Sequence, residues 1–281
     1  MTRRSRIAPL VVVPLLVAGC GSSSGVPPQD TDEAALVGHV HGLGVNPADG
    51  ALFVAGHHGV FRVEDGSPER VADRWQDTMA FTIAGADTFL ASGHPDPRED
   101  LPPHLGLIES TDAAETWDHL SLQGEADFHA LEIVGDRIYG YDATNGRLMT
   151  TTDRTTWETI ATGPYLDLAA TPARPDRVLA TSQDGAVVEV RLDGTVRRVE
   201  GAPELVMVDA TPSGLIVGIS SGGEVHSTRA LADSWTEAGQ VPGSPAALVV
   251  TDDAWYVATD EDIVSSQDQG GTWETVLSSS R

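Results

Sequence analysis

The sequence predicts an all-β fold, a six-bladed β-propeller with four-stranded blades of about 40 residues each. The first observation behind this prediction is an interval, because five of the six tryptophans recur about every 40 residues with one double gap. They are Trp75, Trp117, Trp157, Trp235 and Trp273. The second is that short runs rich in Val, Ile, Leu and Thr are broken by Asn-Pro, Asp-Gly and Gly-Gly turns. The third is that no helical periodicity occurs after residue 20.

The first 20 residues have the order of a bacterial lipoprotein signal. Three arginines precede an apolar stretch from Ile7 to Val17, which is too short for a membrane-spanning helix. The stretch ends in Val17-Ala18-Gly19-Cys20, which resembles a lipobox, where the cysteine is lipidated and becomes the mature N-terminus. We therefore expect residues 1–19 to be a signal peptide and Cys20 to anchor the protein to the extracytoplasmic side of the cell membrane. An ordinary secretory signal with an unrelated cysteine is the alternative.

The rest of the chain divides into a tether and the propeller. Residues 20–37 are small, polar and proline-containing, which is typical of a flexible linker, and residues 38–281 are expected to form the blades. In the first blade we expect the strands HVHGLGV, ALFVAG, VFRVE and RVADRW, separated by turns at residues 46–50, 57–59 and 65–69. The fourth blade lacks the periodic tryptophan, and its outer strand is expected near Arg197. The last blade is expected to supply its own outer strand, so ring closure needs none from the N-terminus.

A local motif precedes several of the periodic tryptophans. The segment from Ser266 to Trp273 reads S-x-D-x-G-x-T-W, the segment from Ser110 to Trp117 has Ala114 in place of the glycine, and the segment at Thr151 is one residue shorter. The motif resembles the Asp-box of BNR-repeat propellers such as sialidases. In such a hairpin turn the aspartate accepts backbone N–H groups, the glycine takes a positive φ and the tryptophan packs between blades. The motif is therefore a structural marker rather than a catalytic one.

Composition limits the possible functions. There are 42 acidic and 17 basic side chains, a formal charge of −25, and all the basic residues are arginines. Such a surface repels phosphate backbones, which excludes a general nucleic-acid partner, and the lack of lysine excludes lysine-dependent chemistry. The single cysteine excludes an intramolecular disulfide. The expected partners are cationic ligands, metal ions or basic protein patches, and no particular protein partner is indicated.

The innermost strands of the six blades can be aligned on an apolar position in each. The anchors are Leu43, Phe81, Leu131, Leu168, Val208 and Leu248. Two residues upstream stand His41, Met79, His129, Leu166, Val206 and Ala246, and four upstream stand His39, Asp77, Asp127, Pro164, Glu204 and Ser244. Residues two apart on a strand share a face, so blades one to three present polar side chains where the other blades are mostly apolar.

Further histidines are expected on the same face, at the ends of second strands. They are His57 and His58 in the first blade, and His94 and His104 around the long loop of the second. Seven of the nine histidines therefore gather on three adjacent blades, while His119 and His226 are expected to be surface or packing residues.

Several segments in residues 39–130 carry a more specific resemblance. They are HVHGLG, GHHG, SGHPDP, LGLIESTD and EADFHAL. The sequence resembles secreted bacterial propellers described as glycosylhydrolase-like or BNR-repeat proteins, a family without an assigned activity. The resemblance implies the fold rather than a reaction.

The first functional hypothesis is a metal site. Imidazoles together with a thioether and carboxylates suit copper, or otherwise zinc, and the methionine favours copper because soft sulfur stabilises Cu(I). The expected ligands are His39, His41, Met79 and His129. The surrounding residues His57, His58, His94, His104, Asp77 and Asp127 are expected to bind the ligand, flank the site or orient the imidazoles. A polar pocket for a small ligand without metal is the nearest alternative.

Two other classes of function stay open. A glycoside hydrolase could draw an acid–base pair from Asp77, Asp127 and Glu125, which are expected on the same face. A sialidase would need an arginine cluster and a tyrosine nucleophile. Arginine is absent from the innermost-strand motifs, and Phe61-Arg62-Val63 is only a faint match to a sialidase segment. The last possibility is a non-catalytic receptor or assembly platform.

Overall fold

The structure, a computed structural model, describes residues 37–229 and 234–278. The expected signal peptide, Cys20 and nearly all of the expected linker lie outside these residues. The described part contains 24 β-strands in six four-stranded antiparallel sheets. Within it, no helix has the length and apolar character needed to cross a membrane.

Each sheet is one blade built from four consecutive strands. The first three blades are β1 Val40–Val45, β2 Leu52–Gly56, β3 Gly59–Glu64, β4 Ser67–Arg70; β5 Asp77–Gly85, β6 Thr88–His94, β7 Leu107–Ser110, β8 Asp118–Ser121; and β9 Phe128–Val134, β10 Arg137–Asp142, β11 Arg147–Thr151, β12 Glu158–Thr162. The last three are β13 Tyr165–Ala169, β14 Arg177–Ser182, β15 Val187–Arg191, β16 Val196–Arg198; β17 Met207–Ala210, β18 Ile216–Ile219, β19 Glu224–Thr228, β20 Thr236–Gln240; and β21 Pro245–Val250, β22 Trp255–Thr259, β23 Asp262–Ser266, β24 Glu274–Ser278.

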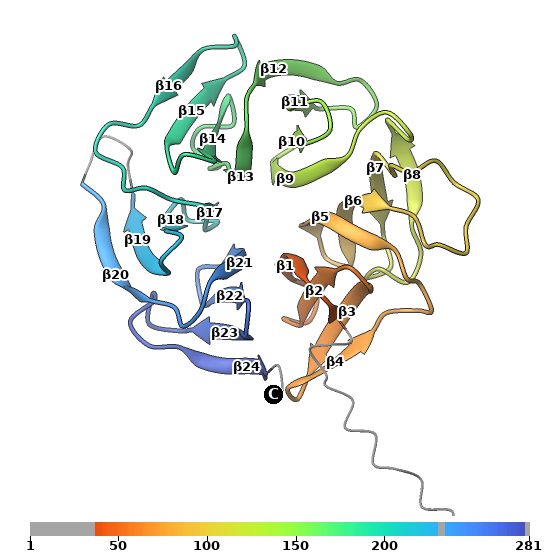
Figure 1. The fold of residues 1–281 in the computed structure, drawn as a ribbon, viewed down its shortest axis with the longest axis horizontal. Coiled ribbons are helices and arrows are strands. Elements are labelled where there is room, and N and C mark those ends of the chain that lie inside the picture. The colour runs from red at the N-terminus through yellow and green to blue at the C-terminus, as the bar shows by residue number, and fades with distance from the viewer. Residues whose placement is uncertain (1–36, 230–233, 279–281) are drawn as a thin grey trace, which may run out of the picture. The chain divides into compact units, whose positions relative to one another are not determined.

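The blades stand in a ring around a common centre (Figure 1). The first strand of each blade is innermost, and each inner strand contacts those of its two neighbours, with β1 against β21 closing the ring. The sixth blade is complete with its own outer strand β24. The predicted six-bladed propeller, its inner strands and its mode of closure are therefore confirmed.

Apolar clusters between adjacent blades hold the ring together. Between the first two blades, the rings of Phe53 and Phe89 meet edge to face with centroids 4.8 Å apart, and Phe81 lies 5.5 Å from Phe89. Trp117 packs against this cluster, and Trp157 packs against the next one, with its ring 4.8 Å from that of Phe128. Because each cluster uses side chains of two blades, no blade buries its apolar faces alone.

The Asp-box-like segments form turns between the third and fourth strands. In the sixth blade, the carboxylate of Asp268 accepts the backbone N–H of Thr272 at 2.8 Å and the hydroxyl of Ser266 at 2.8 Å, and Gly270 has φ +90°. In the second blade, Ala114 occupies the glycine position with φ +74°. The turn geometry tolerates a small side chain there.

The outer strand of the first blade differs from the expectation. It is β4, Ser67–Arg70, and only Arg70 of the expected RVADRW strand belongs to it. Asp65 and Gly66 form a two-residue turn with φ +50° and +80°, as in a tight Asp-Gly hairpin. The outer strand therefore begins directly after Gly66 instead of after the longer turn expected at residues 65–69. Trp75 therefore lies beyond the blade, where the Arg70 guanidinium stands 3.5 Å from its ring centroid.

Candidate metal centre

β-Bulges near the start of the inner strands shape the candidate site. The pairing of β1 with β2, of β5 with β6 and of β9 with β10 shifts by one residue at His41, Met79 and His129 respectively. A bulge interrupts the alternation of side chains and turns the extra residue to a new direction. The equivalent shifts in blades four and six lie at Leu166 and Ala246.

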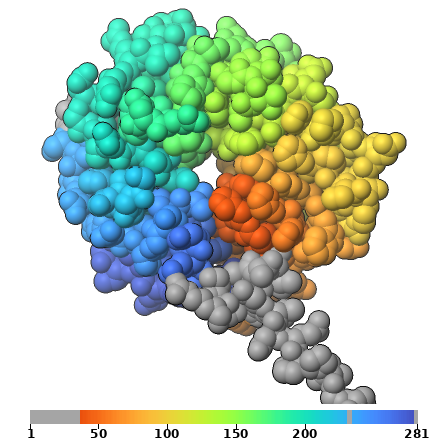
Figure 2. Space-filling view, viewed as in Figure 1, coloured from red at the N-terminus to blue at the C-terminus, as the bar shows by residue number. Residues whose placement is uncertain are grey.

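The bulged side chains line the central channel. Its cavity has a volume of about 490 Å³, and His41, Met79 and His129 contribute to its wall together with Leu166 and Ala246. Figure 2 shows the opening of the ring at its centre, beside the first blade. The alignment made from the sequence thus placed equivalent residues correctly, although the alternation used to justify it is broken at these positions.

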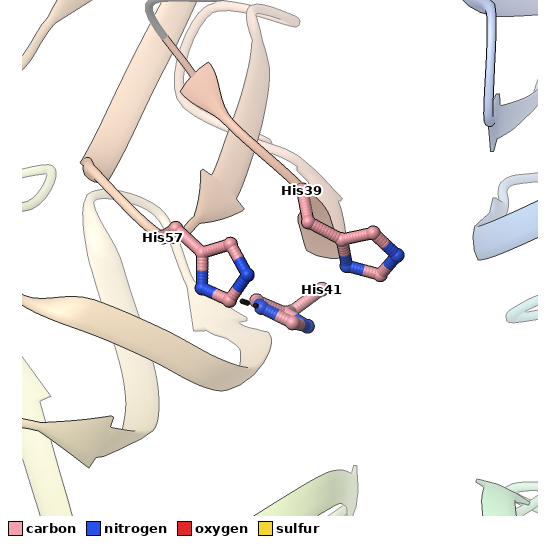
Figure 3. Close-up of side chains that lie close together, drawn as sticks. All are labelled: His39, His41 and His57. Atoms are coloured by element: carbon pink, nitrogen blue, oxygen red, sulfur yellow. Dashed lines mark hydrogen bonds between the residues drawn. The ribbon is translucent and has the colours of Figure 1, made fainter.

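Three imidazoles converge on the first blade, and we name them the three-histidine cluster: His39, His41 and His57. One ligating nitrogen from each lies within 4.8 Å of the others. The ring centroids of His41 and His57 are 4.6 Å apart, and those of His39 and His41 are 4.8 Å apart (Figure 3). His41 Nε2 is 3.3 Å from His57 Nδ1, which is 3.0 Å from the Asp77 carboxylate. Asp77, from the second blade, therefore orients the cluster.

Close backbone packing fixes these three histidines. The backbone N–H of His57 donates to the carbonyl of His39 at 3.2 Å. A β-carbon at Gly56 would lie 2.6 Å from that same carbonyl oxygen, so only glycine permits the approach. The end of β2 is thus held against the start of β1, and His57 is brought beside His39 and His41.

Burial sets the protonation state of His41. It lowers the pKa of His41 to about 4, with His57 adding to the shift and Asp77 opposing it. The imidazole of His41 is consequently neutral at neutral pH, and a neutral imidazole is the form that binds a metal ion.

Three further histidines surround Asp127, and we name this group the Asp127 cluster: His94, His104, His129 and Asp127. Asp127 is 5% exposed. Its Oδ2 is 3.0 Å from His129 Nε2, 3.7 Å from His104 Nδ1 and 3.9 Å from His94 Nε2. One ligating atom each from His94, His104 and Asp127 lies within 4.8 Å of the others.

The long loop of the second blade delivers His104 to this cluster. The N–H of Leu105 donates to the carbonyl of Gly93 at 2.8 Å, and the Leu105 side chain is fully buried. Earlier in the loop, the buried carboxylate of Asp96 accepts the Trp75 N–H at 2.9 Å and pairs with Arg98 at 2.6 Å. The loop is therefore fixed at both ends.

The backbone of Asp127 is held from two sides. Its N–H donates to the fully buried carboxylate of Asp142 at 3.3 Å, and its carbonyl accepts the N–H of Ala143 at 3.0 Å. The next N–H, of Phe128, donates to the Ser92 hydroxyl of the second blade at 3.1 Å. These hydrogen bonds fix the backbone from which the Asp127 side chain extends, and so limit where its carboxylate can lie.

The structure groups the expected residues differently from the sequence alignment. His39 and His41 lie with His57, whereas His129 lies with Asp127, His94 and His104, so the donors form two clusters instead of one. Met79 stands on the channel wall between them. The His58 ring lies 5.9 Å from that of Trp75, beyond the three-histidine cluster. His119 is exposed on β8, and His226 lies on β19 of the fifth blade.

Three channel carboxylates went unnoticed in the sequence: Glu132, Asp167 and Asp209. Asp167 accepts the N–H of Val208 at 3.0 Å, and Asp209 accepts that of Val250 at 2.7 Å, so each links its blade to the next. Burial raises the pKa of Asp167 to about 6 and that of Asp209 to about 7. Burial, followed by these two carboxylates, raises the pKa of Glu132 well above its ordinary range. Their positions next to the anchor residues were a signal that the alignment left unused.

The described blades and clusters define a six-bladed β-propeller with a histidine-rich face. No protein-family model matches the sequence, and no curated protein matches it. Among solved structures, a gluconolactonase from Xanthomonas campestris is similar with a TM-score of 0.64, 12% identity and coverage of 79% of this chain and 84% of that chain.

Two further solved structures are similar to the propeller. The nidogen/laminin complex gives a TM-score of 0.63 at 11% identity, covering 79% of this chain and 91% of that chain. YCF48 bound to a D1 peptide gives 0.53 at 16% identity, covering 85% and 82%. At such identities the likeness establishes the fold alone.

Proposed function

We propose that the protein binds a transition-metal ion, copper in preference to zinc, on the face formed by blades one to three. The observation that carries the proposal is the convergence of three imidazole nitrogens in the three-histidine cluster. Imidazole is a good ligand for both copper and zinc, and His41 is neutral at neutral pH.

Met79 supports the preference for copper. Its side chain lines the same channel wall as His41 and His129, from the blade next to the three-histidine cluster. A thioether is a soft ligand that favours Cu(I) and adds little for zinc. His39, His41 and Met79 thus remain the proposed copper ligands, with His57 joining them and Asp77 orienting the rings. His129, also expected as a ligand, instead hydrogen-bonds to Asp127 in the other cluster.

The proposed location is the outer side of the cell membrane, with the propeller held by a lipid on Cys20. The support is the order of residues around Cys20 and the formal charge of −25, which attracts cations to the surface. A glycosidase is less well supported, because Asp77 and Asp127 are both engaged by histidines.

Copper titration of the full chain tests the proposal. His39→Ala and His57→Ala should each weaken copper binding at least tenfold, because each removes a nitrogen ligand, while His226→Ala on β19 should leave it unchanged. Met79→Leu should weaken Cu(I) binding more than Zn(II) binding, because only the soft sulfur is lost. Unchanged copper affinity in both histidine variants would favour the polar-ligand pocket.

A further inference from the structure

We propose that His94, His104 and Asp127 form a second metal site, separate from the three-histidine cluster and of the kind that zinc occupies. It does not depend on the copper proposal, because the two sites use different ligands. Its donor set of two imidazoles and one carboxylate is typical of zinc sites with three protein ligands.

Two buried atoms of this cluster have no hydrogen-bond partner. Within the described residues, four buried side-chain polar atoms lack one, and two of them are His104 Nδ1 and Asp127 Oδ1. A buried polar atom without a partner is costly, so such atoms are rare and call for an explanation. A cation between the two groups would satisfy Asp127 Oδ1 and, in the tautomer of His104 that carries its proton on Nε2, the lone pair on Nδ1.

The tautomer of His94 points to the same conclusion. Its Nδ1 lies 2.8 Å from the carbonyl oxygen of Pro103, and a carbonyl only accepts, so Nδ1 carries a proton. In the neutral imidazole, Nε2 then holds a lone pair, and this lone pair is on the side of the Asp127 carboxylate. A histidine that donates one nitrogen to a backbone carbonyl and ligates through the other is the usual arrangement at metal sites.

The spacing of the donor atoms fits a metal ion better than hydrogen bonds. His104 Nδ1 and His94 Nε2 are 3.7 and 3.9 Å from Asp127 Oδ2, too far for hydrogen bonds. Ligands about 2.0 to 2.1 Å from a tetrahedral zinc ion lie about 3.3 Å from one another. For an ion held through Oδ2, each of these contacts needs to shorten by about half an ångström. The unpartnered Oδ1 belongs to the same carboxylate.

His129 and the fixed backbone prepare the carboxylate. His129 Nε2 is 3.0 Å from Asp127 Oδ2, so this hydrogen bond orients the carboxylate while Oδ1 has no protein partner. The two clusters meet across the second blade, where Asp77 on β5 pairs with His94 on β6. The ligand set of the proposed site is chemically harder than that of the three-histidine cluster, because a carboxylate oxygen replaces an imidazole nitrogen. A harder ligand set favours Zn(II) over the soft ion Cu(I).

Zinc titration of the metal-depleted full chain, with stoichiometry measured by calorimetry, tests the second site. Wild-type protein should show a zinc-binding step that His104→Ala and Asp127→Asn each weaken at least tenfold. The matched control His119→Ala, an exposed histidine on β8, should leave this step unchanged. The double variant His39→Ala/His57→Ala should also retain it, because its ligands are intact.

Thermal unfolding with and without zinc shows whether each variant is folded and gives a second measure of zinc binding. Zinc should raise the melting temperature of wild-type protein and of the His39→Ala/His57→Ala variant, since a ligand that binds only the folded state stabilises it. It should raise that of Asp127→Asn markedly less. Zinc binding and zinc stabilisation unchanged in both His104→Ala and Asp127→Asn would overturn the second site and leave the copper proposal untouched.

Discussion

Three carboxyl side chains along the channel have pKa values raised by burial. Glu132, Asp167 and Asp209 each face the channel, yet protein encloses them closely enough to raise their pKa values. Asp167 and Asp209 nevertheless accept backbone N–H groups of the following blade. Their ionisation is therefore coupled to the contacts between blades four, five and six.

This coupling predicts a pH-dependent stability that Asp209→Asn changes. The folded pKa of Asp209, about 7, exceeds its ordinary value of 3.8, so the folded chain holds a proton that the unfolded chain releases between these values. Its contribution to the free energy of unfolding is thus complete below pH 3.8 and is lost as the pH rises through 7. Relative to wild type, Asp209→Asn should therefore gain stability in urea unfolding as the pH rises from about 4 to about 7. A difference in the free energy of unfolding between the two proteins that stays constant with pH would contradict this prediction.

At the residue scale, the sequence predicted which side chains gather but not how they pair. Six of the seven expected histidines belong to one of the two clusters, and His58 lies outside them, near Trp75. The division between the clusters depends on the loop that carries His104 and on the backbone around Asp127. The distances between these side chains depend on how the blades pack against one another. Short sequence patterns within one blade do not predict that packing.

Among the elements of the fold, the bulged inner strands matter most for the site. Each bulge adds one residue opposite a single partner and turns His41, Met79 or His129 to the channel. The inner strands and their anchors were predictable from apolar runs. The bulges were not predictable, because one extra residue in a short strand does not visibly disturb the apolar–polar pattern of the sequence, although it changes the direction of the side chain in the structure. The Asp65-Gly66 turn carried a recognisable hairpin signal, and using it would have placed β4 correctly.

Gly93, at the end of β6, is predicted to be essential for both clusters. Its φ is +139°, and a β-carbon there would lie 2.0 Å from the carbonyl oxygen of Asp77. Gly93→Ala should lower the free energy of unfolding by about 2 kcal/mol or more, because the forced movement separates β5 from β6. It should also weaken metal binding, since Asp77 and His94 lie on these paired strands.

Gly135 provides the matched control for this prediction. It also has a positive φ, +61°, but a β-carbon there would meet nothing within 4 Å. Gly135→Ala should therefore cost only the backbone strain of roughly 1–2 kcal/mol and leave metal binding unchanged. Equal metal affinity in wild type and Gly93→Ala would show that the close contact at Gly93 does not position the clusters.

For the whole molecule, the periodic tryptophans and turn residues were sufficient to predict six blades. They work because each blade repeats the same four-strand unit, and Trp117, Trp157, Trp235 and Trp273 pack against clusters shared with a neighbouring blade. Trp75, the remaining periodic tryptophan, lies beyond the first blade and is exposed. Even the blade without a periodic tryptophan forms its outer strand, β16, at Arg197. The chemical asymmetry of the ring was also predictable, since blades one to three carry all members of both clusters.

Membrane anchoring is the prediction that concerns the chain as a whole. Wild-type protein should fractionate with the cell envelope and enter the detergent phase, because acyl chains on Cys20 provide the membrane affinity. Cys20→Ser should abolish this partitioning while leaving the propeller folded. A Cys20→Ser protein that still enters the detergent phase would contradict the proposed anchor.

Metal content is the most direct test of the claim that this propeller is a metal-binding protein. The full chain should be purified without chelators or a histidine tag from cells supplied with copper and zinc, and then analysed for metals. We predict stoichiometric copper in wild-type protein, a lower copper content in His39→Ala/His57→Ala, and unchanged copper in His226→Ala. Copper far below stoichiometric, or the same copper content in all three proteins, would contradict it.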